Sequence, residues 1–227
     1  MRHNSKISSL KNKGICILKN IYSKNETTKF KKKLELVYKK RLKNKGSVGS
    51  SSNQLLYNYF YEDKSLLDLI YNEKIHQILE KVLDKDYVLQ STNAQNRVYK
   101  KTGSKKGEEI GGTWHTDSRY LGGRRLFKGF SYLVIIALDP FTKSNGATRY
   151  IPNSFNNLKK PERRLSPKYE KLSKEIIMDS GSVCIMDSGM WHKAGKSTFS
   201  SRWSIFSIYT GWFVKPYYDC RKLKNIK

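Results

Sequence analysis

The spacing of apolar residues predicts helices in the first third of the chain. Residues 14–18 are a short, mostly apolar run and predict a first strand. Ser23 and Glu26 then match a capping box, which marks the start of a helix. Apolar residues recur after it at helical spacing, with lysines on the opposite face: Phe30, Leu34, Val37, Tyr38 and Leu42. We expect this helix to cover a sheet, and two shorter helices to follow over residues 65–71 and 73–83.

From residue 87 onward the pattern changes to short apolar strands separated by turns. Strands are expected within residues 87–101, 130–138, 147–151, 175–178, 182–186 and 203–209. Asn145-Gly146 is a turn sequence, and residues 46–53, 101–112 and 153–174 are polar and predict loops. Helices followed by many short strands are typical of an α+β, mainly β fold built around a double-sheet barrel.

The length and composition of the chain limit the classes of protein to which it can belong. A chain of 227 residues with 37% hydrophobic residues is long enough for one sizeable core and is not disordered. We expect a single domain over residues 1–227, with its core at 8–212 and a basic tail at 213–227. No apolar run reaches the roughly 18 residues of a membrane span, and no secretory signal is expected. Three cysteines, odd in number and widely spaced, argue against a disulfide framework or a zinc cluster and favour a reducing cytoplasm: Cys16, Cys184 and Cys220.

The net charge is +26, from 45 Lys and Arg against 19 Asp and Glu. Such a charge predicts an anionic partner: a nucleic acid, an acidic metabolite, a phosphorylated substrate or a membrane surface. Most of it, however, is lysine spread along the whole chain, which favours a solvated surface of compositional origin over a reader of bases. Three basic places still stand out, at residues 31–33, 39–41 and 124–125.

Four residues near the edges of expected strands carry the candidate chemistry. His115 and Asp117 lie two positions apart, so both side chains point to the same side of an extended backbone. His192 follows 75 positions after Asp117 (192 − 117) and comes from a distant strand. Two imidazoles and one carboxylate on one face of an ion are the arrangement of non-heme Fe(II) oxygenases. Arg202, ten positions after His192 (202 − 192), is placed to hold a dicarboxylate co-substrate.

The alternative is that these residues serve the core or the surface. An H-x-D tripeptide recurs by chance, and a histidine can be an ordinary core residue. The chain has only four histidines, however, and two fall in this pattern, while His3 lies near the N-terminus and His76 on an expected helix. Arg202 opens an apolar strand in a chain richer in lysine, which favours a functional role over a surface one.

Four stretches follow one another in a recognisable order. They are residues 14–26; residues 97–103 with 114–117; residues 136–140 with 145–154; and residues 179–187 with 191–192 and 201–202. In this order and spacing, over about residues 8–212, the chain resembles the phytanoyl-CoA dioxygenase family of Fe(II)- and 2-oxoglutarate-dependent oxygenases. The most specific element is Asn145-Gly146 leading to Ile151-Pro152-x-Ser154. The resemblance implies a double-stranded β-helix, a cupin-like jelly roll, with the iron at one open end.

The resemblance also implies roles for individual residues. His115, Asp117 and His192 would be the ligands of Fe(II). Arg202 would bind the distal carboxylate of 2-oxoglutarate through a bidentate fork, and Tyr99 matches a strand position that touches the same co-substrate.

The chain departs from the family two residues after the distal histidine. A hydroxyl often helps to hold 2-oxoglutarate there, whereas this chain has Ala194. Thr148 or Tyr132 is the expected substitute. Related halogenases have a small residue in place of the carboxylate ligand, so Asp117 favours hydroxylation.

Substrate contacts are expected on the far side of the iron. Gln95 and Arg97 precede Tyr99 by four and two positions, so all three share a strand face that points into the barrel. Three arginines after the H-x-D motif either hold an anionic substrate or lie in a solvated loop: Arg119, Arg124 and Arg125. Residues 101–112 are either a lid over the iron or a plain connector. Trp114 and Trp191, each directly before a histidine ligand, are expected to pack and fix the backbone.

The favoured function is a dioxygenase that uses Fe(II), 2-oxoglutarate and O2 to hydroxylate a small molecule, an anionic one among the candidates, with release of succinate and CO2. One alternative is an oxygenase of the same chemistry acting on a nucleic acid, because of the charge of +26. The other is a non-catalytic jelly-roll binding module. The sequence predicts neither the substrate nor the oligomeric state.

Overall fold

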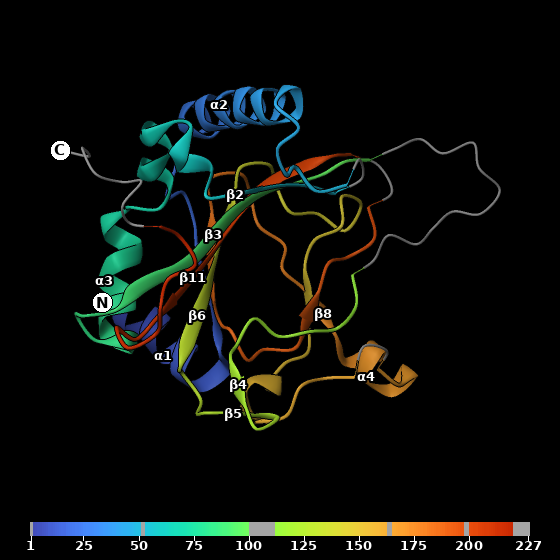
Figure 1. The fold of residues 1–227 in the computed structure, drawn as a ribbon. Helices are drawn as coiled ribbons and strands as arrows, with labels where there is room; N and C mark the ends of the chain where they lie inside the picture. The colour runs from blue at the N-terminus through green and yellow to red at the C-terminus, as the bar shows by residue number, and fades with distance from the viewer. Residues whose placement is uncertain (1, 51–52, 100–111, 163–164, 198–199, 220–227) are drawn as a thin grey trace.

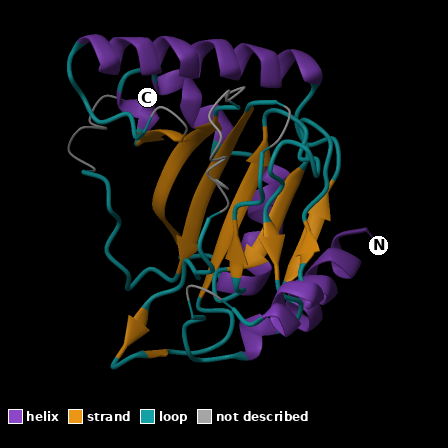
Figure 2. Cartoon of the chain, turned by 90° about the vertical axis from the view of Figure 1, so that its right-hand side faces the viewer, coloured by secondary structure: helices purple, strands orange, loops and turns teal. Residues whose placement is uncertain are grey.

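The computed structural model describes residues 2–50, 53–99, 112–162, 165–197 and 200–219. Two antiparallel sheets enclose part of the core, and helices cover the outer face of the larger sheet (Figures 1 and 2). No helix among these residues is long and apolar enough to cross a membrane.

The larger sheet has six strands, and every neighbouring pair is antiparallel. In spatial order they are β1 (Ile15–Leu18), β9 (Val183–Asp187), β6 (Ser131–Ala137), β11 (Arg202–Thr210), β3 (Val88–Arg97) and β2 (Asn53–Tyr57). The smaller sheet has the order β10 (His192–Lys193), β7 (Arg149–Tyr150) and β8 (Lys174–Glu175). A separate ribbon pairs β4 (Tyr120–Leu121) with β5 (Arg124–Arg125). The expected mainly β fold with N-terminal covering helices is confirmed.

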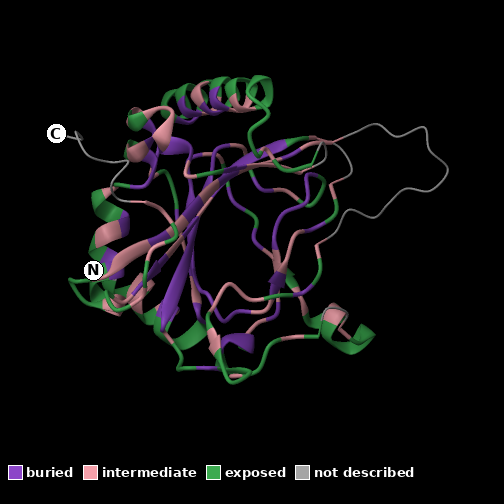
Figure 3. Cartoon of the chain, viewed as in Figure 1, coloured by how far each residue is buried: buried purple, intermediate pink, exposed green. Residues whose placement is uncertain are grey.

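Buried hydrophobic residues form two clusters, one on each face of the larger sheet. Figure 3 shows the central strand β6 of this sheet coloured as buried. Ile136 of β6 belongs to the cluster under the helices, and its neighbour Ile135 belongs to the cluster between the sheets. All seven residues of β6 are buried. A strand covered on both faces has no polar side, which explains why residues 130–138 read as a continuous apolar run.

The covering helices are α1 (Arg2–Lys13), α2 (Lys24–Lys43) and α3 (Glu73–Leu83), and α4 (Pro167–Leu172) lies apart from them beside the smaller sheet. Short 3-10 turns occupy Tyr59–Tyr61, Lys64–Leu69 and Ser154–Asn156. In α2 the buried residues are Thr27, Phe30, Leu34 and Val37, whereas the predicted face residue Leu42 is exposed. The expected helix over residues 65–71 is the 3-10 turn Lys64–Leu69.

Helix α1 and strand β2 were not expected from the pattern of apolar residues. Of the apolar side chains in α1, Leu10 is fully buried and Ile7 partly so, and two residues are too few to show a helical period. The helix ends at Lys13. The next residue, Gly14, has a φ of +71° that suits glycine, and a Cβ there would lie 2.6 Å from the ring of Phe155. Strand β2 follows the expected loop but begins at its last residue, Asn53, and mixes polar and apolar residues without alternation.

Replacing Ser23 with alanine is expected to lower the free energy of unfolding by about 1 kcal/mol, as loss of a helix cap usually does. Oγ of Ser23 accepts from the backbone N of Glu26 at 3.2 Å, and Oε2 of Glu26 accepts from the backbone N of Ser23 at 2.7 Å. These bonds lower the pKa of Glu26, so its part of the effect is present at neutral pH and fades as the pH falls through that pKa. Urea denaturation measures the change. Thr28→Ala in the same helix is the control, and an equal loss in both variants would contradict the role of the cap.

Candidate metal centre

Three side chains from two distant parts of the sequence converge beside β10. One ligand atom from each of His115, Asp117 and His192 lies within 4.8 Å of the others. Nε2 of His192 is 3.3 Å from Oδ2 of Asp117, and Nε2 of His115 is 3.9 Å from Oδ1 of the same carboxylate. A single ion between them is within reach of all three groups.

Backbone hydrogen bonds bring these ligands together. His115 and His192 face each other as an antiparallel bridge, with N–H···O distances of 3.0 and 2.9 Å in the two directions. The backbone N of Asp117 donates to the carbonyl of Ser188 at 2.9 Å. His192 itself begins β10 and pairs with Tyr150 of β7. The H-x-D motif thus joins the smaller sheet through one bridge rather than through a regular strand.

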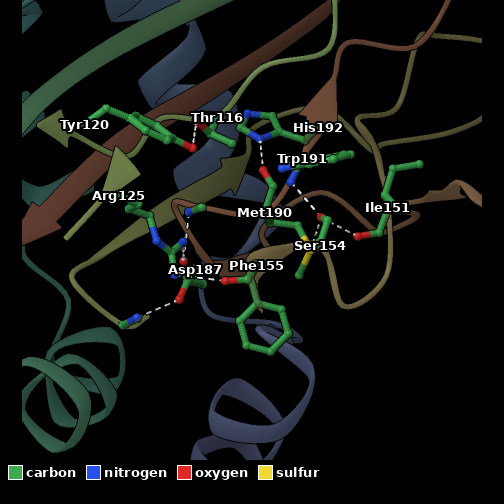
Figure 4. A network of polar contacts seen from close by, with 12 residues as sticks. Thr116, Tyr120, Arg125, Ile151, Ser154, Phe155, Asp187, Met190, Trp191 and His192 are labelled. Atoms are coloured by element: carbon green, nitrogen blue, oxygen red, sulfur yellow. Dashed lines mark hydrogen bonds and ion pairs between the residues drawn. The ribbon is translucent and has the colours of Figure 1, made fainter. Parts of the chain in front are cut away.

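Both imidazoles are held in the orientation that metal binding requires. Nδ1 of His115 lies 2.8 Å from the carbonyl of Thr113, and Nδ1 of His192 lies 2.8 Å from the carbonyl of Met190 (Figure 4). A carbonyl only accepts, so each Nδ1 carries a proton, and each Nε2 faces the shared space as the atom that would bind a metal.

The charges of the cluster suit a cation. Although burial opposes the shift, His192 and then His115 lower the pKa of Asp117, which keeps this carboxylate ionised. Burial, and then the charge of His192, lower the pKa of His115, so that this ring is neutral at neutral pH. Burial lowers the pKa of His192, but Asp117 outweighs it and raises that pKa, and a bound metal would displace the proton.

Exposure differs across the three ligands and leaves one side open. The side chain of His192 is 6% exposed, that of Asp117 27% and that of His115 48%. Two nitrogen ligands and one carboxylate with an open side are the donor set of a facial Fe(II) site. The residues present therefore fit iron.

Arg202 is a buried cation with unused donors. It is 1% exposed, and its Nε and Nη1 have no hydrogen-bond partner among the described residues. Its guanidinium lies 3.6 Å from the ring centre of Phe141, a residue of the core between the sheets. Burial and then the charge of Arg97 lower the pKa of Arg202 to about 9. A desolvated guanidinium beside another cation is stabilised by a bound anion.

The strand register places Arg97 directly opposite Arg202. Residues paired across antiparallel strands share a face, so the two guanidinium groups lie on one side of the larger sheet. Gln95 pairs with Ser204 on the same face, and its Nε2 donates to Oδ1 of Asn53 in β2 at 2.6 Å. Both Gln95 and Arg97 thus lie on the same face of the larger sheet as Arg202. The register also brings Arg97, predicted as a substrate contact, to the end of the sheet where the co-substrate is expected.

Three further residues were expected to contact the co-substrate: Tyr99, Thr148 and Tyr132. Tyr99 lies two residues beyond β3, and its backbone N donates to Oγ of Ser201, the residue before Arg202, at 3.0 Å. Thr148 is buried next to β7, and its carbonyl accepts from the backbone N of Ile176. Tyr132 is buried as well. Residues 101–111 of the proposed lid lie outside the described residues.

The three arginines after the motif have different environments. Arg119 is exposed, with its guanidinium 4.4 Å from the ring centre of Tyr217. Arg124 is exposed, but Arg125 is fully buried and forms an ion pair with Asp187 at 2.7 Å. Arg125 is therefore enclosed in the fold, and neither a solvated loop nor a substrate contact describes it.

Glu170 in α4 joins both flanks of the site and was not predicted. Its Oε1 accepts from Nε1 of Trp114 and from Nζ of Lys193, each at 2.6 Å. Trp114 precedes His115, and Lys193 follows His192, so one carboxylate fixes the neighbours of both histidines. Trp114 is 2% exposed, which confirms its expected packing role. Glu170 sits in the polar insertion 56 residues from Trp114, and nothing in the local sequence marks it.

Comparison with known proteins identifies a family and a relative of this chain. The family model described as phytanoyl-CoA dioxygenase (PhyH) matches residues 10–203. An uncharacterized protein of Mycobacterium tuberculosis is 31% identical over 98 residues, which are 42% of this chain and 35% of that protein. The match thus spans about a third of the relative's length.

Solved structures share the fold at low sequence identity. The epimerase SnoN, in complex with Fe3+, alpha ketoglutarate and nogalamycin RO, aligns over 100% of this chain and 91% of its own, with a TM-score of 0.71 and 12% identity. HygX from Streptomyces hygroscopicus, with nickel, 2-oxoglutarate and hygromycin B bound, aligns over 94% and 89%, with a TM-score of 0.70 and 11% identity. The expected jelly-roll core is confirmed.

Proposed function

The chain belongs to the phytanoyl-CoA dioxygenase family, and we propose that it is an Fe(II)- and 2-oxoglutarate-dependent dioxygenase that hydroxylates a small molecule. The observation that carries the proposal is the conjunction of two features. One is the cluster of His115, Asp117 and His192, and the other is the buried Arg202 with unused donors. A metal-binding module alone does not account for the second feature. In the overall reaction, substrate, O2 and 2-oxoglutarate yield hydroxylated product, succinate and CO2.

When bound, iron and 2-oxoglutarate supply the oxidising chemistry, and the residues of the chain position and shield it. His115, Asp117 and His192 would hold the iron on one face and leave the open side for the co-substrate and O2. Arg202 would bind the distal carboxylate of 2-oxoglutarate. Its burial strengthens that contact, because little water competes for the guanidinium.

Arg97 is the best candidate for the second co-substrate contact that Ala194 lacks. It lies opposite Arg202 in the sheet and is itself buried, and burial lowers its pKa. Two neighbouring cations repel each other, and a shared carboxylate between them removes that cost. Tyr99 and Thr148 stay candidates for lesser contacts.

A small-molecule substrate would lie on the polar side of the site. The inner face of β3 and β2 offers amide groups, with Gln95 bonded to Asn53. Arg119 borders the motif on the solvent side and is exposed enough to meet an anionic group. HygX, which shares the fold, was crystallised with hygromycin B, and this supports a small molecule as the class of substrate.

A metabolite screen for substrate-stimulated succinate formation tests the proposal. With the right substrate, Fe(II) and isotopically labelled O2, one labelled oxygen atom should appear in the product and one in succinate. His115→Ala is the control and should form no succinate above background. Full activity in that variant would overturn the metal assignment. A product without new oxygen, such as an epimer, would overturn hydroxylation while leaving the cofactor requirement intact.

A further inference from the structure

A buried ion pair lies behind the metal ligands. The side chains of Arg125 and Asp187 are 0% and 3% exposed, and Nη1 of Arg125 donates to Oδ1 of Asp187 at 2.7 Å (Figure 4). Nη2 of Arg125 donates to the carbonyl of Phe155 at 2.9 Å. Burying two charges is costly, and a well-packed apolar pair of similar volume often serves stability as well. Such a pair calls for a reason beyond stability.

The carboxylate of Asp187 organises the turn that follows β9. Its Oδ1 also accepts from the backbone N of Gly189 at 2.8 Å, and its Oδ2 accepts from the backbone N of Gly129 at 2.9 Å. Its carbonyl accepts from the backbone N of Met190 at 2.9 Å. The turn over residues 187–190 is thus held from inside by one side chain.

Residue 189 shows how closely the turn and Arg125 are matched. A Cβ on Gly189 would lie 1.1 Å from Nη1 of Arg125. Only glycine lets the backbone approach the guanidinium this closely, so the sequence Asp187-Ser188-Gly189 and Arg125 form one unit.

The same turn carries the supports of two metal ligands. The carbonyl of Ser188 accepts from the backbone N of Asp117 at 2.9 Å. The carbonyl of Met190 accepts from Nδ1 of His192 at 2.8 Å. Ser154 fixes the backbone directly after the turn. Its Oγ accepts from the backbone N of Trp191 at 2.8 Å and donates to the carbonyl of Ile151 at 2.7 Å (Figure 4).

We propose that the Arg125–Asp187 pair is a positioning device for the metal centre. It fixes the turn at residues 187–190 so that the carbonyls of Ser188 and Met190 hold Asp117 and His192 in their ligand geometry. The inference rests on the proposed function, because it takes these residues as ligands. Outer-shell partners of metal ligands typically contribute about 10- to 100-fold to affinity or activity.

Binding of Co(II), used as a spectroscopic stand-in for iron, tests the proposal without any need for turnover. Asp187→Asn should bind Co(II) about 10- to 100-fold more weakly than the unaltered chain. The visible spectrum of the saturated variant should also differ, since the ligands are less well fixed. The double variant Arg125→Met, Asp187→Leu removes both charges, so no unpaired charge is left to unfold the chain, and it should show the same losses.

Arg41→Met is the matched control. Arg41 lies near the end of α2, away from the ligands, and forms a bidentate pair with Glu62 at 2.7 Å. The Co(II) affinity and spectrum of this variant should therefore stay unchanged. Folded variants of Asp187 with unaltered affinity and spectrum would overturn the positioning role and leave the proposed function standing. Failure of the unaltered chain to bind Co(II) would overturn the proposed function, and the inference with it.

Discussion

Replacing His192 with alanine is expected to reduce iron affinity by at least about 100-fold and to abolish substrate-stimulated succinate formation. The loss should exceed the 10- to 100-fold typical of an outer-shell partner, because a ligand itself is removed. His192 is the most buried of the three ligands and lies closest to Asp117, at 3.3 Å. Two remaining ligands do not complete a facial site.

The measurement is a calorimetric titration with Mn(II) or anaerobic Fe(II), together with a succinate assay. His76→Ala is the control, since His76 lies in α3 and contacts Tyr87 and Ile70 rather than the metal cluster. This control variant should lose stability but keep its metal affinity. Unchanged metal binding in His192→Ala would contradict the ligand assignment.

Replacing Arg202 with methionine is expected to weaken 2-oxoglutarate binding by about 30-fold or more, because truncating one partner of a buried charge pair costs about 2–5 kcal/mol. The same change should raise the melting temperature of the protein without co-substrate. Nε and Nη1 of Arg202 lack hydrogen-bond partners among the described residues, so the variant removes a buried cation with donors left without hydrogen bonds. Methionine retains the packing on Phe141.

These opposite changes separate a co-substrate contact from a purely structural arginine. Thermal melting with and without 2-oxoglutarate, in the presence of metal, measures both at once. Arg41→Met serves as the comparison and should lower the melting temperature without changing the affinity for 2-oxoglutarate. A destabilised Arg202→Met variant that binds 2-oxoglutarate normally would show that Arg202 only supports the fold.

Local patterns were enough to predict the parts of the site that depend on spacing along the chain. His115 and Asp117 share one side because they lie two positions apart, and the capping box at Ser23 is formed by neighbouring residues. The continuous apolar run of β6 and the turn at Gly146, with φ of +77°, follow from single short segments.

Contacts that depend on register and long-range packing could not be predicted in this way. The pairing of Arg97 with Arg202 follows from how β3 and β11 align, which includes a bulge between Ile208 and Tyr209. Arg125 and Asp187 are 62 positions apart, and the sequence predicted either a substrate contact or a solvated loop for Arg125, neither of which is a buried ion pair. Nothing in the local sequence shows whether a basic residue of a two-stranded ribbon is buried or exposed.

The charge of +26 and the choice of substrate are separate questions from the metal centre. Basic residues meet acidic partners at several places, as Lys31 does with Asp139 and Arg41 with Glu62. Each of these pairs is neutral, so the pairs leave the excess of +26 unchanged. The nucleic-acid oxygenase and the non-catalytic module stay alternatives to the proposed function, and salt-titrated binding to oligonucleotides tests the first of them.

An anaerobic titration of 2-oxoglutarate into the Fe(II)-loaded protein, followed by visible absorption, measures whether His115, Asp117 and His192 hold iron and its co-substrate. A 2-oxo acid chelated to Fe(II) gives a charge-transfer absorption that neither component gives alone. We expect this absorption with one 2-oxoglutarate per chain, and its absence in Asp117→Ala and His192→Ala. Absence of the absorption in the unaltered chain, or its survival in both variants, would show that these residues do not form the iron site.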